Sequence, residues 1–390
     1  MSDKVTELEL EAAPSSSGIG KKIIAIIVAV AVVCGVVAVA LFGEWLNLDN
    51  FRRWFKYMNV SERSDYGSYR FDSHSSNRYS AFGDGLAIAS VSGFNAYDER
   101  GGELFVLQEQ MDLPQLVVQN EMAMTYDVGG NALLAVHEKK GEVLRLSEAR
   151  AILDADLSSG GYICLSSSAS GYKSVLSVYN DHQDLVYRWL SSTTYIPQCA
   201  VSPDGKTMVA VGLGQENGVF ESTLLYFRTD SEEIQMEVSL GSELVYDLFF
   251  ADPDTICVIG ETAVQSLNLK GEVLGTYTYE APYLKDYDTC GSGFLALSLN
   301  MYRAGNRYTL VTVDKQGRKL AEAYIGQEIL DISANGRYVA VLTSEGLTIY
   351  TNNLVVYDET IETGNATAVV MRQDGSVLLL GNGQGRLYIP

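Results

Sequence analysis

The side chains that could carry out chemistry are few and widely spaced. Histidine occurs three times, at His74, His137 and His182, and nothing at metal-ligand spacing surrounds any of them. Each is therefore expected to be a surface or packing histidine. Paired carboxylates such as Asp252 and Asp254 are of a kind common in turns and suggest no acid–base role. The sequence predicts no metal site.

Motifs for nucleophilic or phosphate chemistry are incomplete. The chain has no G-x-S-x-G, and residues 170–173 (SGYK) match S-x-x-K without its S-D-N and K-T-G partners. Residues 205–207 (GKT) resemble the end of a P-loop, but Val201 stands where a glycine is required. The glycines of 381–385 precede a strand, whereas phosphate binding needs a following helix. We therefore predict no catalytic residues, no cofactor and a protein that is not an enzyme.

Composition limits the classes of partner. The net charge of −21 argues against nucleic acid, because a phosphate backbone selects basic surfaces. Of the five cysteines, Cys34 lies in an apolar run, and Cys164, Cys199, Cys257 and Cys290 are dispersed without a C-x-x-C pair. Buried free thiols are the favoured interpretation of these four, and disulfides are the alternative.

An apolar run near the N-terminus predicts a membrane anchor. Residues 23–42 are 20 uncharged residues, which as a helix span about 30 Å, the thickness of the hydrocarbon core. We assign residues 21–43 to one transmembrane helix and residues 1–20 to a disordered cytoplasmic tail. A cleaved signal peptide, with 38–40 (AVA) as its cleavage site, is the alternative. Lys21 and Lys22 favour a cytoplasmic N-terminus and an extracytoplasmic C-terminal part.

Residues 44–65 are expected to form a juxtamembrane amphipathic stalk. The two readings are a short helix on the outer leaflet and a stalk that packs on the globular domain. The apolar positions at helical spacing are Trp45, Leu48, Phe51, Phe55 and Met58.

From residue 66 onward a unit of roughly 40 residues recurs, built around a polar turn and an apolar strand. A strand precedes each turn, and two more strands follow most of them, which makes four antiparallel strands a unit. Such a repeat is typical of a β-propeller blade. The eight copies are 83–90, 119–126, 158–166, 202–212, 251–260, 291–299, 333–343 and 372–381.

The last copy supplies only three strands, so its fourth must come from elsewhere. Residues 68–72 (SYRFD), just before the first copy, are the candidate, and this pairing would close the ring. The predicted fold is all-β, an eight-bladed propeller over residues 66–390 preceded by one transmembrane helix. Seven blades and an array of β-sandwiches are the alternatives.

The turns SPDGKTMVAVG and YDERGGEL resemble those of WD-repeat and quinoprotein-like propellers. A single span ahead of such a propeller resembles a bacterial membrane family of unknown function. The resemblance implies a fold rather than an activity. The Trp-Asp dipeptide of WD repeats and the tryptophan motifs of quinone dehydrogenases are absent, since Trp189 is the only tryptophan after residue 54.

Three connections between the second and third strands of a unit are longer than the others: 166–174, 212–222 and 299–308. Long loops on a rigid scaffold concentrate binding residues, and Tyr and Arg are favoured interface anchors. Tolerated insertions are the alternative. The predicted binding residues on the upper face are Tyr172, Lys173, Phe220, Tyr302, Arg303 and Arg307.

These features predict a non-catalytic binding or scaffold protein of the bacterial cell envelope, with one membrane span. Its expected ligand is a protein, a peptide or a cell-wall glycan. A propeller enzyme, either a quinoprotein-like dehydrogenase or a glycan hydrolase, and a ligand sensor are the alternatives.

Overall fold

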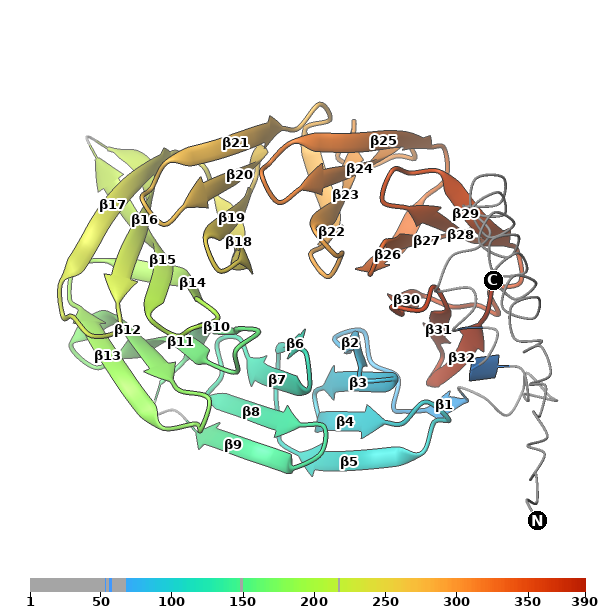
Figure 1. The fold of residues 1–390 in the computed structure, drawn as a ribbon, viewed down its shortest axis with the longest axis horizontal. Helices are drawn as coiled ribbons and strands as arrows, with labels where there is room; N and C mark the ends of the chain where they lie inside the picture. The colour runs from blue at the N-terminus through green and yellow to red at the C-terminus, as the bar shows by residue number, and fades with distance from the viewer. Residues whose placement is uncertain (1–52, 54–55, 58–67, 148–149, 217) are drawn as a thin grey trace, which may run out of the picture. The chain divides into compact units, whose positions relative to one another are not determined.

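The computed structural model describes residues 53, 56–57, 68–147, 150–216 and 218–390. The chain divides into two compact units, Met1–Asn59 and Val60–Pro390. In the first unit, the described residues Arg53, Lys56 and Tyr57 are helical. The second unit is a ring of eight antiparallel sheets, each with four strands (Figure 1).

The first four blades follow the chain in order. Blade 1 contains β2 (Arg78–Phe82), β3 (Gly85–Ser90), β4 (Gly93–Tyr97) and β5 (Glu103–Gln108). Blade 2 contains β6 (Pro114–Gln119), β7 (Met122–Asp127), β8 (Ala132–His137) and β9 (Gly141–Ser147). Blade 3 contains β10 (Ile152–Leu157), β11 (Ile163–Ala169), β12 (Tyr172–Tyr179) and β13 (Leu185–Ser191). Blade 4 contains β14 (Tyr195–Val201), β15 (Thr207–Glu216), β16 (Val219–Arg228) and β17 (Ile234–Gly241).

The remaining blades complete the ring. Blade 5 contains β18 (Val245–Asp252), β19 (Thr255–Gly260), β20 (Ala263–Asn268) and β21 (Val273–Thr278). Blade 6 contains β22 (Tyr283–Asp288), β23 (Phe294–Asn300), β24 (Tyr308–Asp314) and β25 (Lys319–Ile325). Blade 7 contains β26 (Ile329–Asn335), β27 (Tyr338–Thr343), β28 (Leu347–Thr351) and β29 (Val356–Thr360). Blade 8 contains β30 (Ala368–Met371), β31 (Val377–Gly381), β32 (Gln384–Tyr388) and β1 (Tyr69–Arg70).

The burial of each strand follows its place in the blade. The second strands are rich in apolar residues, and β3 and β19 are buried along their whole length because neighbouring blades cover both faces of the sheet. An outermost strand such as β17 instead alternates between half-buried and exposed residues. Tight turns join the strands, and Gly205 adopts a φ of +68° in one of them. The apolar core is therefore distributed between successive blades.

The ring closes by pairing the two ends of the described propeller. Tyr69 lies opposite Gly385 and Arg70 opposite Gln384, so β1 is the fourth strand of blade 8. Tyr69 is fully buried, and its ring meets that of Tyr97 in blade 1 edge-on, with centroids 5.9 Å apart. The predicted all-β fold, the closure through 68–72 and the count of eight blades are confirmed, and the alternative of seven blades is wrong.

The structure describes only a few residues of the N-terminal region that was expected to contain a tail, a membrane span and a stalk. The predicted tail (1–20) and span (21–43) lie outside the described residues, as does most of the stalk (44–65). Within the residues that are described, no helix is long and apolar enough to cross a membrane. Cys164, Cys199, Cys257 and Cys290 are all free thiols, and the sulfur atoms of Cys164 and Cys199 lie 3.4 Å apart between blades 3 and 4. The first three are buried as expected, whereas Cys290, which follows β22, is exposed.

Candidate binding face

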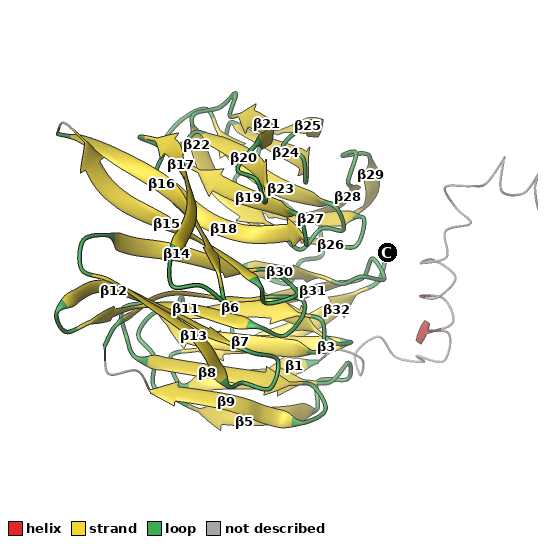
Figure 2. Ribbon diagram, turned by 60° about the vertical axis from the view of Figure 1, so that its left-hand side comes forward, coloured by secondary structure: helices red, strands yellow, loops and turns green. Residues whose placement is uncertain are grey.

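One side of the ring carries the hairpins between second and third strands together with the connections between blades, and we call it the hairpin face. The tips of the β11–β12 and β15–β16 hairpins project on the same side (Figure 2). All six predicted binding residues are exposed and lie on hairpins of this face. Tyr172 and Lys173 begin β12, Phe220 is the second residue of β16, and Tyr302, Arg303 and Arg307 lie between β23 and β24.

The six residues form three groups rather than one cluster. The hairpins of blades 3 and 4 belong to neighbouring blades, whereas blade 5 separates them from the hairpin of blade 6. Among the described residues, no hydrogen bond or ion pair joins one of these three hairpins to another. Any ligand that contacts all six must therefore span four blades.

The hairpin face also carries every exposed Tyr, Phe or Trp side chain of the described part. There are seven such side chains, and all come from blades 3 to 6, where each lies in or within two residues of a hairpin or a blade connection. A surface that exposes so many rings on one side is typical of an interaction site. They are Tyr172, Tyr195, Phe220, Tyr246, Tyr283, Tyr302 and Tyr324, with 39–66% of each residue exposed.

Four of these aromatic residues were not predicted. Tyr195, Tyr246 and Tyr283 stand at the start of innermost strands, and Tyr324 stands at the end of the outermost strand of blade 6. A signal does exist: a tyrosine is the first residue of β14 and of β22 and the second residue of β18, directly after the connections between blades. The prediction considered only long loops and therefore overlooked residues in short connections.

The hairpin of blade 6 is held in one conformation by Asn300, which is fully buried. Its side-chain amide donates to the Gly305 carbonyl (2.7 Å), and its side-chain oxygen accepts from the Tyr302 N–H (2.9 Å). The Lys285 ammonium donates to the Arg303 carbonyl (2.7 Å). The exposed side chains of residues 301–307 are thus presented by an ordered backbone.

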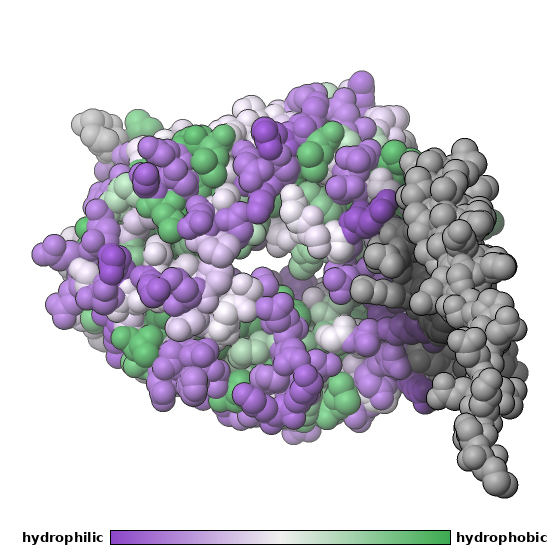
Figure 3. Space-filling view, viewed as in Figure 1, coloured by the Kyte–Doolittle hydropathy of each residue, from purple (hydrophilic) through white to green (hydrophobic). Residues whose placement is uncertain are grey.

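The inner channel is a second place where chemistry could reside. A central opening remains between the blades (Figure 3). Besides Asp252, which forms an ion pair with Lys315, six aspartates stand on the innermost strands of blades 3, 5, 6 and 7. Five of them accept a hydrogen bond from a backbone N–H of the next blade's innermost strand. These bonds are Cys199 to Asp154 (2.8 Å), Val201 to Asp156 (3.2 Å), Ile332 to Asp286 (3.3 Å), Ala334 to Asp288 (2.9 Å) and Val369 to Asp331 (2.7 Å).

The sixth aspartate, Asp247, bonds to the Tyr287 hydroxyl of the next blade. Together the six connect blade to blade at the channel wall, and five of them pair N–H groups that the free edges of the innermost strands would otherwise leave unpaired. Burial raises the pKa of all six carboxyls. Among the described residues, no group of three or more His, Cys, Asp or Glu could hold a metal ion. We interpret the carboxylates as structural.

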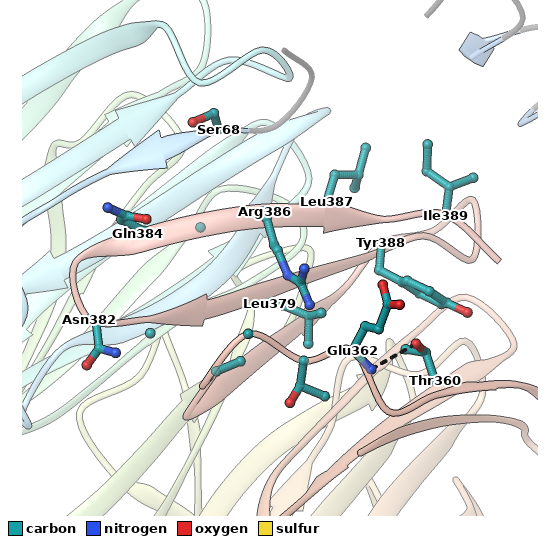
Figure 4. Close-up of a pocket in the computed structure, with 15 residues that line it drawn as sticks. Ser68, Thr360, Glu362, Leu379, Asn382, Gln384, Arg386, Leu387, Tyr388 and Ile389 are labelled. Carbon is teal, nitrogen blue, oxygen red and sulfur yellow. Dashed lines mark hydrogen bonds between the residues drawn. The ribbon is translucent and has the colours of Figure 1, made fainter. Parts of the chain in front are cut away.

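A cavity of about 530 Å³ lies at the edge of blades 7 and 8 (Figure 4). β32 pairs with β31 along its length, but β1 pairs with only Gln384 and Gly385 and therefore leaves the rest of the outer side of β32 without a neighbouring strand. Arg386, Glu362 and Tyr388 border the cavity, and the Tyr388 hydroxyl donates to Asp358 (2.6 Å). Nothing among these lining residues forms a nucleophile–base pair.

The incomplete motifs and the three histidines lie in turns or at the surface, as the sequence predicts. The sequences at 170–173, 205–207 and 381–385 all contain turns. His137 lies 3.6 Å from Glu121, and His182 lies 3.0 Å from Asp181, both at hairpin turns. His74 bonds to the Ser76 hydroxyl (2.6 Å).

Comparison with solved structures places the fold in the class of WD40-like β-propellers. The chain is similar to the C-terminal WD40 domain of Sif2, with 11% identity and a TM-score of 0.54 over 83% of this chain and 97% of that one. The RRP9 WD40 repeats (70% and 92% covered) and U3-55K (70% and 93%) each share 9% identity at a TM-score of 0.46. At identities this low, similarity informs on the fold alone. We base the comparison on the Sif2 domain because its TM-score is above 0.5.

A sequence model of one protein family matches this chain. Residues 55–383 match the family of unknown function DUF5711, and the chain belongs to that family. A search of curated proteins finds no match.

Proposed function

We propose that this chain is a membrane-anchored, non-catalytic binding or scaffold protein of the bacterial cell envelope. Its propeller lies outside the cytoplasm and holds a partner on the hairpin face. The 20-residue uncharged run at 23–42 supports the anchor, and Lys21 and Lys22 support the orientation. A protein, a peptide or a cell-wall glycan are the classes of partner that this arrangement fits.

One observation carries the binding role: all seven exposed aromatic side chains of the described part lie on one face and on four successive blades. Burying Tyr and Phe side chains supplies much of the affinity of protein interfaces, whereas in solution their exposure is unfavourable. WD40-like propellers are commonly scaffolds for binding, which agrees with this interpretation.

The described residues support the two alternative functions, a propeller enzyme and a ligand sensor, less well than they support a binding protein. A propeller enzyme would need free acid or base groups in the channel, yet the six described aspartates there are hydrogen-bonded to the next blade. A sensor would use the same hairpin face but would also pass a signal through the span.

Proximity labelling in living cells tests this proposal, with a labelling enzyme fused after Pro390 of the full chain. We expect labelled envelope proteins, and we expect the combined Tyr302→Ala, Arg303→Ala and Arg307→Ala variant to lose at least one of them. The physical reason is that interface anchors such as Tyr and Arg each contribute about 2 kcal/mol or more.

A matched control changes Leu269→Ala and Lys270→Ala, which lie in the β20–β21 turn on the other side of the ring and are also exposed. This variant should keep the wild-type labelling pattern. Equal patterns for all three proteins would refute the hairpin face as the binding surface. Labelling of cytoplasmic proteins would instead refute the orientation.

A further inference from the structure

Blade 6 concentrates cationic and apolar side chains at the hairpin face. We call Tyr283, Lys285, Met301, Tyr302, Arg303 and Arg307 the blade 6 platform; all six are exposed. Tyr283, Met301 and Tyr302 expose 39%, 37% and 51% of their surface. The Lys285 ammonium lies 5.7 Å from the centroid of the Tyr283 ring. Rings and cations therefore share one surface.

The cations of the platform have no carboxylate partner. Within the described part of the chain, Lys285, Arg303 and Arg307 form no ion pair. The chain has 49 acidic and 28 basic residues, so these cations remain without an ion pair although acidic groups are abundant. Other described lysines and arginines do form ion pairs, among them Lys139, Arg145, Lys206, Arg228, Lys315, Arg318 and Lys319.

The geometry points to a binding site for a carboxylate-rich peptide segment of a partner protein: we propose that the blade 6 platform binds such a segment. This inference rests on the proposed binding role of the hairpin face. Guanidinium groups pair with carboxylates in a bidentate geometry, and the adjacent rings can cover the apolar residues of the segment.

A peptide explains the platform better than a glycan because aliphatic side chains accompany the rings. Leu244 of blade 5, Met301 of blade 6 and Leu330 of blade 7 are 41%, 37% and 43% exposed, and all lie at hairpins or blade connections of the same face. Aliphatic side chains gain most by burial against other apolar side chains, which a protein supplies. The ordered backbone of residues 301–307 also reduces the entropy lost on binding.

The test uses the purified full chain in zwitterionic detergent and fluorescence anisotropy of two short labelled peptides. One peptide alternates Glu with Leu and Tyr, and the other has Gln in place of Glu. We expect the Glu peptide to bind at least about tenfold more tightly than the Gln peptide, which equals about 1.4 kcal/mol. Its affinity should also weaken as salt is added, since exposed charges are screened.

Charge reversal identifies the site. Arg303→Glu with Arg307→Glu should abolish binding of the Glu peptide, while Lys270→Glu, an exposed lysine in the β20–β21 turn, should leave it unchanged. Equal binding of the two peptides, no binding of either, or an unchanged affinity after Arg303 and Arg307 reversal overturns the proposal. A phosphodiester polymer or glycan that binds the platform in place of the Glu peptide also overturns it.

The failure of this inference differs from failure of the proposed function. If the Glu peptide does not bind but the Tyr302, Arg303 and Arg307 variant still loses its partners in cells, the hairpin face is a binding surface for another chemistry. If the variant keeps every partner, the proposed function itself fails.

Discussion

Replacing Tyr69 by alanine is expected to lower the free energy of unfolding by about 3–5 kcal/mol, as for other large aromatic side chains removed from a core. Tyr69 belongs to the two-residue strand β1, yet it is fully buried in the apolar cluster that joins blades 1 and 8. The Tyr97 hydroxyl of blade 1 donates to the carbonyl of the neighbouring residue Arg70 (3.0 Å). Little else in β1 holds the two ends of the ring together.

Urea unfolding followed by tryptophan and tyrosine fluorescence measures this loss. Tyr69→Phe keeps the ring and is expected to be nearly as stable as the wild type, because the Tyr69 hydroxyl makes only a 3.5 Å contact with the Glu99 carbonyl. Tyr324→Ala, at a residue 66% exposed, should change the free energy by less than about 0.5 kcal/mol. A Tyr69→Ala protein as stable as Tyr324→Ala would contradict the closure described above.

Raising the pH from about 5 to 9 is expected to lower the melting temperature. Burial raises the pKa of channel carboxyls that ionise near pH 4 in an unfolded chain. Between about pH 4 and the raised pKa values, the folded protein binds more protons than the unfolded chain. Stability is therefore highest in mild acid and falls as the pH rises through the raised pKa values. Those values are about 6 for Asp154 and Asp286, about 7 for Asp247, and about 8 for Asp156 and Asp331.

The variant Asp156→Asn isolates one of these groups. An asparagine side-chain oxygen can still accept the Val201 N–H but cannot ionise. The variant should show a flatter dependence of melting temperature on pH and a higher melting temperature than the wild type at pH 9. Asp230→Asn is the control, because the Arg228 hydrogen bond lowers the pKa of this exposed carboxyl. A wild-type melting temperature that rises towards pH 9, or an Asp156→Asn profile as steep as the wild type, would count against this account.

The fold was largely predictable because each blade repeats local signals that depend on short stretches of chain. The turn around Gly205 needs a positive φ, and the apolar strand that follows it must be covered on both sides. Closure by residues 68–72 was predictable because the last unit contains only three strands and needs a fourth from elsewhere in the chain. The length of β1 was not predictable, because a strand of two residues is too short to show an alternation of apolar and polar side chains.

The candidate site was predictable only in part. The expectation of long loops pointed to Tyr172, Phe220 and Tyr302. For 166–174 and 212–222 that expectation was wrong, because long strands joined by only two residues (170–171 and 217–218) occupy most of these segments. The exposed tyrosines at the starts of innermost strands depend on which residue falls at the end of the sheet. In β18 the first residue, Val245, is buried and the next, Tyr246, is exposed. The channel aspartates carried a signal that was overlooked, since a D-x-D pattern occurs in β10 at 154–156 and in β22 at 286–288.

The most direct test of the account is a hydroxyl-radical footprint of the full chain in its native membranes and after purification in detergent. If the hairpin face holds a partner in the membrane, the seven exposed aromatic side chains of blades 3 to 6 should oxidise several-fold more slowly there than in the purified protein. Leu269 and Val355, exposed in turns on the other side of the ring, should oxidise equally in both samples. Equal oxidation of the seven aromatic residues in both samples, or protection confined to Leu269 and Val355, would contradict the account.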